Sequence, residues 1–349
     1  MTDQVMANNQ AKLSQYIKNV KSSFLPTGVK QQLIYKKIND YLSITNYIQT
    51  NSKASVLYSS KPVVTNTKPI TTNTFVKTSV PTKYALLVGI NYKGTSRKLD
   101  GCINDVTNMK NLLTNKCGFQ DKNIIFITDD TSIKPTKTNI LNNLTKLIKN
   151  AKSGDTLFFG YSGHGTNSIN LNGTELSGKD QLLVPLDGLS TSTCIKDDEI
   201  NTIIRTNIVD GVKMFGLIDA CYSGTVFDLK FNYMTDTLTN NSTNTFSITS
   251  NPKINPIGKG QVFMLSGSKD EQTSADAAII SNGVKTYTGA LTYSFLKTIE
   301  QKGITINFKD LLTNIRIFLN QNKFTQIPQI SSDTFVDISA VSLNQYLSN

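Results

Sequence analysis

From residue 83 onwards, the chain alternates short, continuously apolar runs with segments whose apolar residues recur every three or four positions. The runs predict buried strands at 84–90, 123–130, 155–163, 180–185, 213–219 and 261–268. The spaced residues predict helices between these strands, and Thr136 stands where it can cap one of them. Strands that are apolar throughout need cover on both faces. The pattern therefore predicts an α/β fold, with helices on both faces of a mainly parallel central sheet.

Residues 1–82 form a different region. Residues 1–83 hold eleven Lys and two Asp, a net charge of +9 out of the +11 of the whole chain. Apolar spacing predicts two short helices at 13–24 and 34–42, followed by a Thr-, Asn- and Ser-rich linker at 51–82. This basic arm has the charge to contact an anionic partner, either a nucleic acid or a membrane surface. We favour a solvated arm, because its lysines do not cluster with aromatic residues.

Three further features concern the environment of the chain. No run reaches the about 18 consecutive apolar residues of a membrane span. The start lacks a basic segment followed by an apolar one, so we expect no secretory signal and a cytoplasmic protein. The four cysteines are widely scattered, which favours free thiols over a disulfide framework.

Residues 229–259 have few apolar residues and no helical period, and predict a long exposed loop.

A histidine and a cysteine each follow an apolar strand. His164, the single histidine, stands between two glycines in "FFGYSGHGTN", and Cys221 lies in "LIDACYSG". If the two strands are neighbours, the imidazole and the thiol meet at the carboxyl edge of the sheet. The histidine then activates the thiol for nucleophilic attack and protonates the leaving amine. The N–H groups of Gly165 and Cys221 are candidates for stabilising the oxyanion. The alternative is that Cys221 is a buried core thiol.

With these residues, the chain resembles the metacaspases, the calcium-dependent cysteine peptidases of the caspase-like clan. The resemblance implies a caspase-like three-layer sandwich at 83–349, with a large-subunit-like part at 83–228, the loop at 229–259 and a small-subunit-like part at 260–349. It also implies a zymogen that acts as a monomer on protein or peptide substrates. The matching segments are "YALLVGINY", "LDGCINDV", "YSGHG", "DQLLVPLDG", "KDDEI", "IDACYSGTVFDL", "SGSKDEQTSADA", "TGALTYSFL" and "QIPQISS".

The resemblance implies that the S1 pocket, which binds the substrate residue before the cleaved bond, is acidic. The matching positions are Cys102, Asp105, Ser162 and Asp219. Two carboxylates would hold a Lys or Arg side chain by charge-assisted hydrogen bonds. Asp219 precedes Cys221 by two residues on a strand, so both side chains point to one face. A role in stabilising a helix N-terminus also accounts for Asp105.

A calcium site is implied by the same resemblance. The four aspartates that match the family's ligands are Asp180, Asp197, Asp198 and Asp228. Calcium binds hard oxygen ligands, and carboxylates brought together without a cation repel one another. The alternative for Asp197 and Asp198 is that they cap the helix that begins at "DDEI".

The chain departs from the family pattern in two places, and a third feature concerns processing. Tyr222 replaces the usual histidine after the nucleophile, and the basic arm replaces a Pro/Gln-rich region, which puts an autoinhibitory role for the arm in doubt. Lys230, Lys253 and Lys259 fall in the segment 229–259 and are candidate self-cleavage sites.

Three other functions are compatible with parts of the sequence. A caspase-like peptidase that cleaves after Asp needs a basic pocket, for which Arg97 is the candidate. A catalytically weak or inactive scaffold would keep the fold and use the arm for binding. A thiol-redox protein would need a resolving cysteine near Cys221, and the sequence has none there.

Overall fold

The computed structural model describes residues 81–171, 173, 175, 177–235, 246–267, 276–281 and 284–348, and seven residues between 14 and 22. The chain divides into two compact units, Met1–Thr78 and Ser79–Asn349. In the first unit the described residues are helical and fall within the first predicted helix. The second predicted helix and linker residues 51–80 lie outside the described residues. In the described part of the chain, no helix has the length and apolar character needed to cross a membrane.

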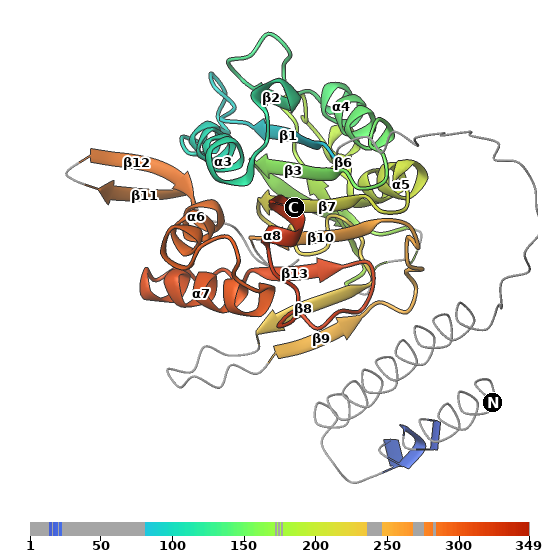
Figure 1. Cartoon of the computed structure of the whole chain (residues 1–349). Helices are drawn as coiled ribbons and strands as arrows, with labels where there is room; N and C mark the ends of the chain where they lie inside the picture. Colours follow the sequence, from blue (N-terminus) through green and yellow to red (C-terminus); the bar gives the residue numbers. More distant parts are fainter. Residues whose placement is uncertain are drawn as a thin grey trace, which may run out of the picture. The chain divides into compact units, whose positions relative to one another are not determined.

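An eight-stranded sheet forms the centre of the second unit (Figure 1). Its first five strands pair in parallel, and its last three join by antiparallel pairing. The order across the sheet is β2 (Ile124–Thr128), β1 (Lys83–Gly89), β3 (Thr156–Ser162), β7 (Lys213–Asp219), β10 (Gln261–Ser266), β13 (Gln329–Ser332), β8 (Phe231–Thr235) and β9 (Phe246–Ser250).

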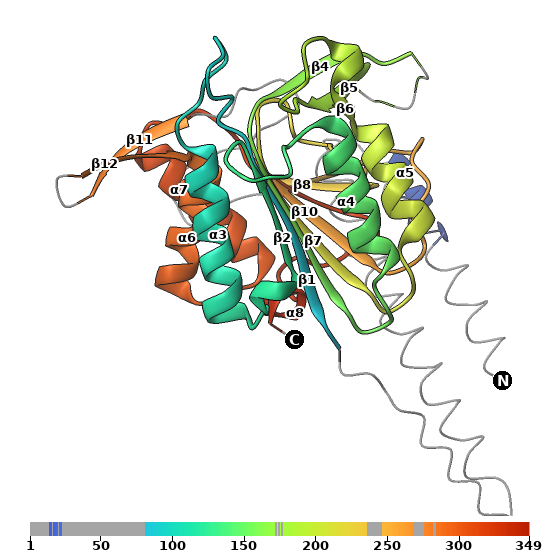
Figure 2. The same cartoon turned by 90° about the horizontal axis from the view of Figure 1, so that it is seen from above.

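Helices cover both faces of this sheet (Figure 2). One face carries α4 (Lys137–Lys149) and α5 (Asp197–Asn207), and the other carries α3 (Cys102–Cys117), α6 (Ala290–Lys302), α7 (Phe308–Gln321) and α8 (Asn344–Leu347). Each layer buries its own apolar core against the sheet, as burial of apolar surface requires. The predicted three-layer α/β sandwich is therefore confirmed. So is the cap of α4, because the Thr136 hydroxyl accepts a hydrogen bond from the Asn139 N–H.

The run at 180–185 forms a strand, but this strand lies outside the central sheet. β5 (Lys179–Leu183) pairs with β4 (Gly165–Ile169) and β6 (Ile195–Lys196) in a separate antiparallel sheet. Its apolar residues are buried against the core that α5 covers. A buried run shows that a strand is covered without showing which strands it pairs with. The remaining short elements are a hairpin of β11 (Asp276–Ser281) and β12 (Val284–Gly289), and 3-10 turns at Asp121–Asn123 and Thr191–Thr193.

The prediction of an exposed loop at 229–259 is wrong for two stretches. Residues 231–235 form β8 and residues 246–250 form β9, at the edge of the central sheet. In β8 the Tyr233 side chain is fully buried, and in β9 Phe246 and Ile248 pack partly buried against the core. Strands at the edge have one covered face, so their apolar residues alternate with polar ones. The segment 236–245 lies outside the described residues.

Candidate active site

The segments that carry His164 and Cys221 lie side by side at the carboxyl edge of the central sheet. β3 and β7 pair in parallel, with Ser162 opposite Asp219. His164 and Cys221 therefore each follow this pair by two residues. The Gly163 N–H donates to the Asp219 carbonyl across 3.3 Å. A Cβ atom on Gly165 would lie 2.0 Å from the Cys221 carbonyl oxygen, so only glycine allows this approach.

The His164 ring is held from two sides. Its Nε2 lies 2.7 Å from the Arg97 carbonyl oxygen. A carbonyl only accepts, so Nε2 carries the hydrogen and Nδ1 is the acceptor nitrogen in the neutral ring. The Tyr92 ring packs against the imidazole at 4.7 Å between centroids, and its hydroxyl accepts from the His164 N–H at 2.9 Å. The ring is thus fixed in orientation, with Nδ1 as its acceptor nitrogen.

Cys221 begins a tight turn after β7. Tyr222 has a φ of 54°, in the left-handed region that side chains other than glycine adopt at a cost, and the Ser223 hydroxyl donates to the Ala220 carbonyl at 2.8 Å. Cys221 is partly exposed, whereas the other three cysteines are buried. Burial raises the pKa of Cys117 and of Cys194, which keeps those thiols protonated. Cys221 is therefore the cysteine that outside molecules reach.

Asp105 and Asp219 lie close together beside this turn. Their carboxylates face one glycine: a Cβ on Gly289 would lie 2.2 Å from Asp219 Oδ2 and 2.8 Å from Asp105 Oδ2. Asp105 also accepts from the Ser162 hydroxyl at 2.6 Å. Cys102 is the first residue of α3, one turn before Asp105 in that helix, and is buried. The fold thus brings together Asp105, Ser162 and Asp219 and places Cys102 next to them in α3.

The acidic pair is bound by the N-terminus of α6. The Gly289 N–H donates to both Asp105 oxygens at 2.9 Å, and the Thr288 hydroxyl donates to the same carboxylate. Asp219 accepts from the Thr292 N–H and hydroxyl at 2.8 and 2.9 Å. Burial raises the pKa of Asp105, and the nearby charge of Asp219 raises it further. The helix N-terminus offsets part of the negative charge.

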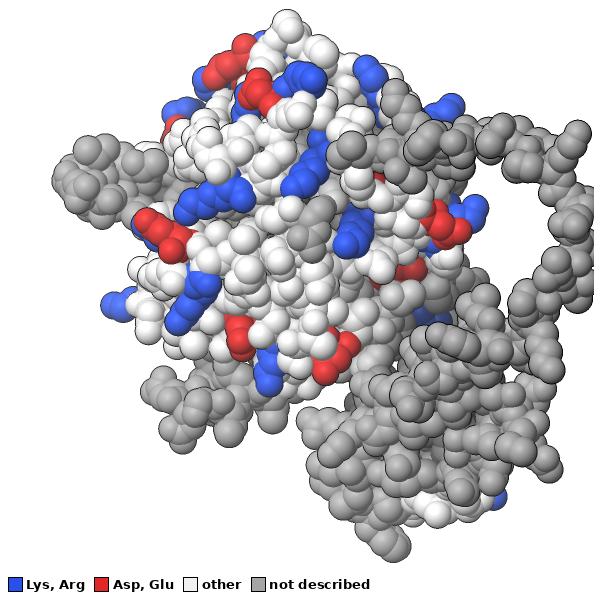
Figure 3. Space-filling view, viewed as in Figure 1, with Lys and Arg blue, Asp and Glu red and all other residues white. Residues whose placement is uncertain are grey.

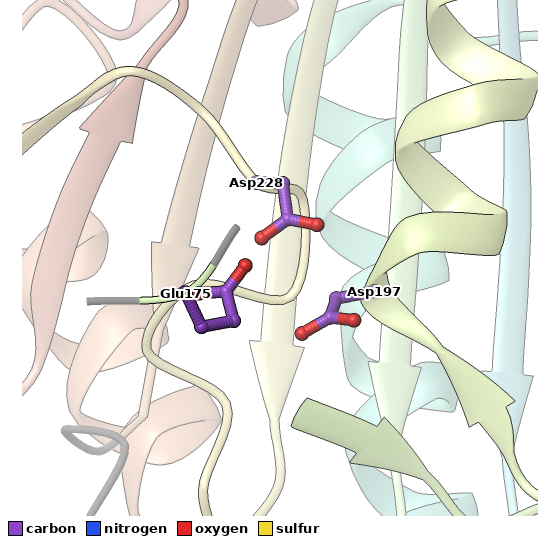
Figure 4. A group of neighbouring side chains, drawn as sticks. All are labelled: Glu175, Asp197 and Asp228. Carbon is purple, nitrogen blue, oxygen red and sulfur yellow. The ribbon is translucent and has the colours of Figure 1, made fainter. Parts of the chain in front are cut away.

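A second acidic cluster lies on the side of β5 and α5. The oxygens of Asp180, Asp197 and Asp198 lie within 4.8 Å of one another, as do those of Glu175, Asp197 and Asp228. Figure 4 shows the second group, with three side chains from separate segments pointing toward one another. Asp197 is held by the N–H groups of Gln181 and Asp198. The fold thus brings all four predicted calcium ligands into two groups that share Asp197.

The donor set of this cluster fits a hard divalent cation. Burial raises the pKa of Asp197, and it raises that of Asp228, where the charges of Asp197 and Glu175 add to the effect. Asp228 Oδ1 is buried without a hydrogen-bond partner. All candidate ligands are carboxylate oxygens, which calcium binds in sets of about six to eight.

Several site residues were not anticipated from the sequence. The Arg97 carbonyl orients the histidine, and no sequence pattern marks a backbone acceptor. Thr288 and Gly289 bind Asp105 across 183 and 184 residues of the chain, and Thr292 binds Asp219 across 73 residues. Glu175 was overlooked, although its charge and position in the connection before β5 were visible.

The Arg97 side chain contacts Gly188 and Tyr92. Its guanidinium donates to the Gly188 carbonyl at 2.5 Å and lies over the Tyr92 ring. It is therefore engaged elsewhere and does not form a basic pocket with Asp105 and Asp219.

Comparisons of the sequence with a family model and with curated proteins identify the same family. Residues 83–230 match the family described as "Metacaspase, peptidase C14 domain". The chain is 38% identical to Metacaspase-1 of Eremothecium gossypii over 73% of its own length, and spans 65% of that relative. It is 34% identical to Metacaspase-1 of Meyerozyma guilliermondii, over 72% of this chain and 69% of that one. The fold is shared with the crystal structure of protein GSU0716 from Geobacter sulfurreducens, with a TM-score of 0.52 and 19% identity over 77% of this chain and 97% of that one.

Proposed function

This chain belongs to the metacaspase family, and from that premise we propose that it is a cysteine endopeptidase that cleaves proteins or peptides after Lys or Arg. Cys221 is the nucleophile and His164 the base, and the protein acts as a monomer. The observation that carries the proposal is the paired register of β3 and β7, which sets both residues at one level of the sheet edge. The fixed ring of His164, with Nε2 on the Arg97 carbonyl, supports it.

The proposed reaction follows from these positions. His164 Nδ1 takes the thiol proton, and the Cys221 sulfur attacks the scissile carbonyl carbon. The N–H groups of Gly165 and Cys221 stabilise the tetrahedral oxyanion. When the C–N bond breaks, the imidazolium gives its proton to the leaving amine, and a thioester remains. Water, deprotonated by His164, then hydrolyses the thioester and returns the thiol.

The preference for a basic residue rests on the acidic pair. Asp105 and Asp219 are two buried carboxylates near the nucleophile, and a bound Lys or Arg side chain would relieve their mutual repulsion. A preference for Asp needs a cationic pocket, and the Arg97 guanidinium is committed to Gly188. The hydrogen bonds from Gly289 and Thr292 set the orientation of the two carboxylates. These contacts favour Lys or Arg over Asp at this position.

The first test is hydrolysis of fluorogenic peptides with Arg, Lys or Asp before the cleaved bond. We expect turnover of the Arg and Lys peptides, and a loss of at least about 1,000-fold in kcat for Cys221→Ala and for His164→Ala. Asp219→Asn should lower kcat/KM for the Arg peptide by about 10- to 100-fold, because one charge-assisted contact is lost. Faster cleavage of the Asp peptide, or activity retained by Cys221→Ala, would contradict the assignment.

Calcium is the proposed cofactor of the second acidic cluster. Asp180, Asp197, Asp198 and Asp228 would hold it, and it would supply two positive charges among carboxylates that otherwise repel one another. Asp228 follows Cys221 by seven residues and sits at a φ of 47°, so the cluster is joined to the segment after the nucleophile. The contact of Thr225 with Gln181 Oε1 at 2.6 Å ties this segment to β5 as well.

Calcium removal tests this assignment. We expect a chelator to lower peptide hydrolysis by at least about tenfold and added calcium to restore it, because the segment after Cys221 loses its tie to α5. Asp228→Asn should lose most of this response. The matched control is Asp210→Asn, the same change at an exposed position. Equal activity with chelator and with calcium would show that the cluster needs no such ion.

We also propose that the protein is a zymogen that cuts itself in the segment 229–259. Lys253 and Lys259 are exposed, whereas Lys230 is half-buried directly before β8, where its carbonyl accepts from the Asn251 N–H. A peptidase needs an extended, accessible strand. Lys253 and Lys259 are therefore the favoured sites.

Mass spectrometry of purified protein incubated with calcium tests the cleavage. We expect new termini after Lys253 or Lys259 in the parent and none in Cys221→Ala. Changing both lysines to Gln should remove these termini and lower hydrolysis of the Arg peptide, because the uncut zymogen is the less active form. Fragments at the same lysines from pure Cys221→Ala protein would assign the cuts to a contaminating protease.

The space-filling view adds one observation on charge. On the face in Figure 3, basic and acidic side chains of the described residues are scattered among neutral ones. No continuous basic patch is formed by the residues described on that face. The N-terminal arm, which we propose as the region that binds an anionic partner, lies almost wholly outside the described residues.

A further inference from the structure

We propose that Glu175 is a direct ligand of the cation site, in addition to the four aspartates. This inference rests on the proposed calcium site and names one more residue that holds the ion. Glu175 lies in the connection between β4 and β5. Its role as a ligand would join this connection to α5 and to the segment after the nucleophile.

The first support is the convergence of three side chains. One oxygen from each of Glu175, Asp197 and Asp228 lies within 4.8 Å of the others. All three residues are at least nine-tenths buried. They come from three separate segments and point toward a common space (Figure 4). A cation there would contact all three at once.

The second support is the state of Asp228. Asp228 is only 6% exposed, yet its Oδ1 atom has no hydrogen-bond partner. A buried carboxylate oxygen without a partner is costly, because it has lost its hydration. Its backbone also holds a φ of 47°, which the surrounding structure must maintain. An ion bound by Asp228 and Glu175 would satisfy this oxygen.

The third support is the contrast with Asp180. Asp180 is already neutralised in part by Lys196, whose Nζ lies 2.8 Å from Oδ2, and its Oδ1 accepts a hydrogen bond from the Asn170 amide at 2.5 Å. In the described part of the chain, Asp197 and Asp228 have no Lys or Arg within 4.0 Å. Asp197 and Asp228, the two aspartates grouped with Glu175, therefore have no neutralising lysine or arginine among the described residues.

The coordination number of calcium leaves room for this additional ligand. The ion takes about six to eight oxygens, and four aspartates leave room for a glutamate and water. Its affinity rises with the number of charged ligands. Glu175 is thus expected to raise the calcium affinity of the site.

The connection that carries Glu175 also contacts one of the proposed self-cleavage sites, because Lys253 Nζ donates to the Gly173 carbonyl.

Isothermal titration with calcium chloride tests the inference on the full-length Cys221→Ala protein, which cannot digest itself. We expect Glu175→Gln to raise the calcium Kd at least tenfold. The matched control is Glu300→Gln, an exposed glutamate paired with Lys297 on α6, which should change the Kd less than twofold. A parent that binds no calcium would overturn the calcium site and this inference together. A parent that binds it and a Glu175→Gln protein with the same Kd would overturn the role of Glu175 alone.

Thermal unfolding separates a ligand from a merely structural residue. In a chelator, Glu175→Gln should unfold at the parent's temperature or above it, because removing one carboxylate relieves repulsion. In saturating calcium the parent should gain more than the variant. A variant that is destabilised equally in both buffers, or that fails to fold without calcium, would show a structural role and contradict the proposal.

Discussion

The parallel register of β3 and β7 is the constraint on which the site depends. It sets Ser162 opposite Asp219, and so places His164 and Cys221 at one level and Asp105 next to Asp219. A shift of one residue in this register would turn the side chains to opposite faces of the sheet. The register is fixed by apolar strands whose side chains are buried on both faces. The chemistry of the sheet edge therefore rests on the packing of the core beneath it.

The structure holds two groups of buried carboxylates, and the two groups differ in their hydrogen-bond partners. Asp105 and Asp219 receive hydrogen bonds from the N-terminus of α6 and from two threonines. The cluster around Asp197 has one lysine at Asp180 and a buried oxygen of Asp228 without a partner. Protein donors bind both carboxylates of the first group, whereas in the second group Asp197 accepts from two backbone N–H groups and Asp228 Oδ1 has no protein donor. A cation would satisfy this oxygen. This difference is why we assign substrate binding to one group and ion binding to the other.

Much of the fold was predictable from apolar periodicity. The strands β1, β3, β7 and β10 of the parallel half of the sheet are mostly buried, as their apolar runs indicate, and the helices α3 to α7 show their apolar spacing in the sequence. The antiparallel edge was missed, because in β9 polar residues alternate with Phe246 and Ile248. The pairing of β5 was also missed, since a run shows burial and not partners. In the site, Cys221 and His164 are marked by their glycine-flanked turns. The Arg97 carbonyl and the hold of Gly289 on Asp105 arise from contacts between distant segments, which no local pattern records.

The central claim is that His164 acts on the thiol of Cys221, and the reactivity of that thiol tests it without any substrate. The measurement is the rate of Cys221 alkylation by iodoacetamide at pH 7, followed by mass spectrometry, in the parent and in His164→Ala. The account predicts at least tenfold slower alkylation in the variant, because the imidazole no longer takes up the thiol proton. Alkylation of Cys221 at the same rate in both proteins would contradict the pairing of the two residues.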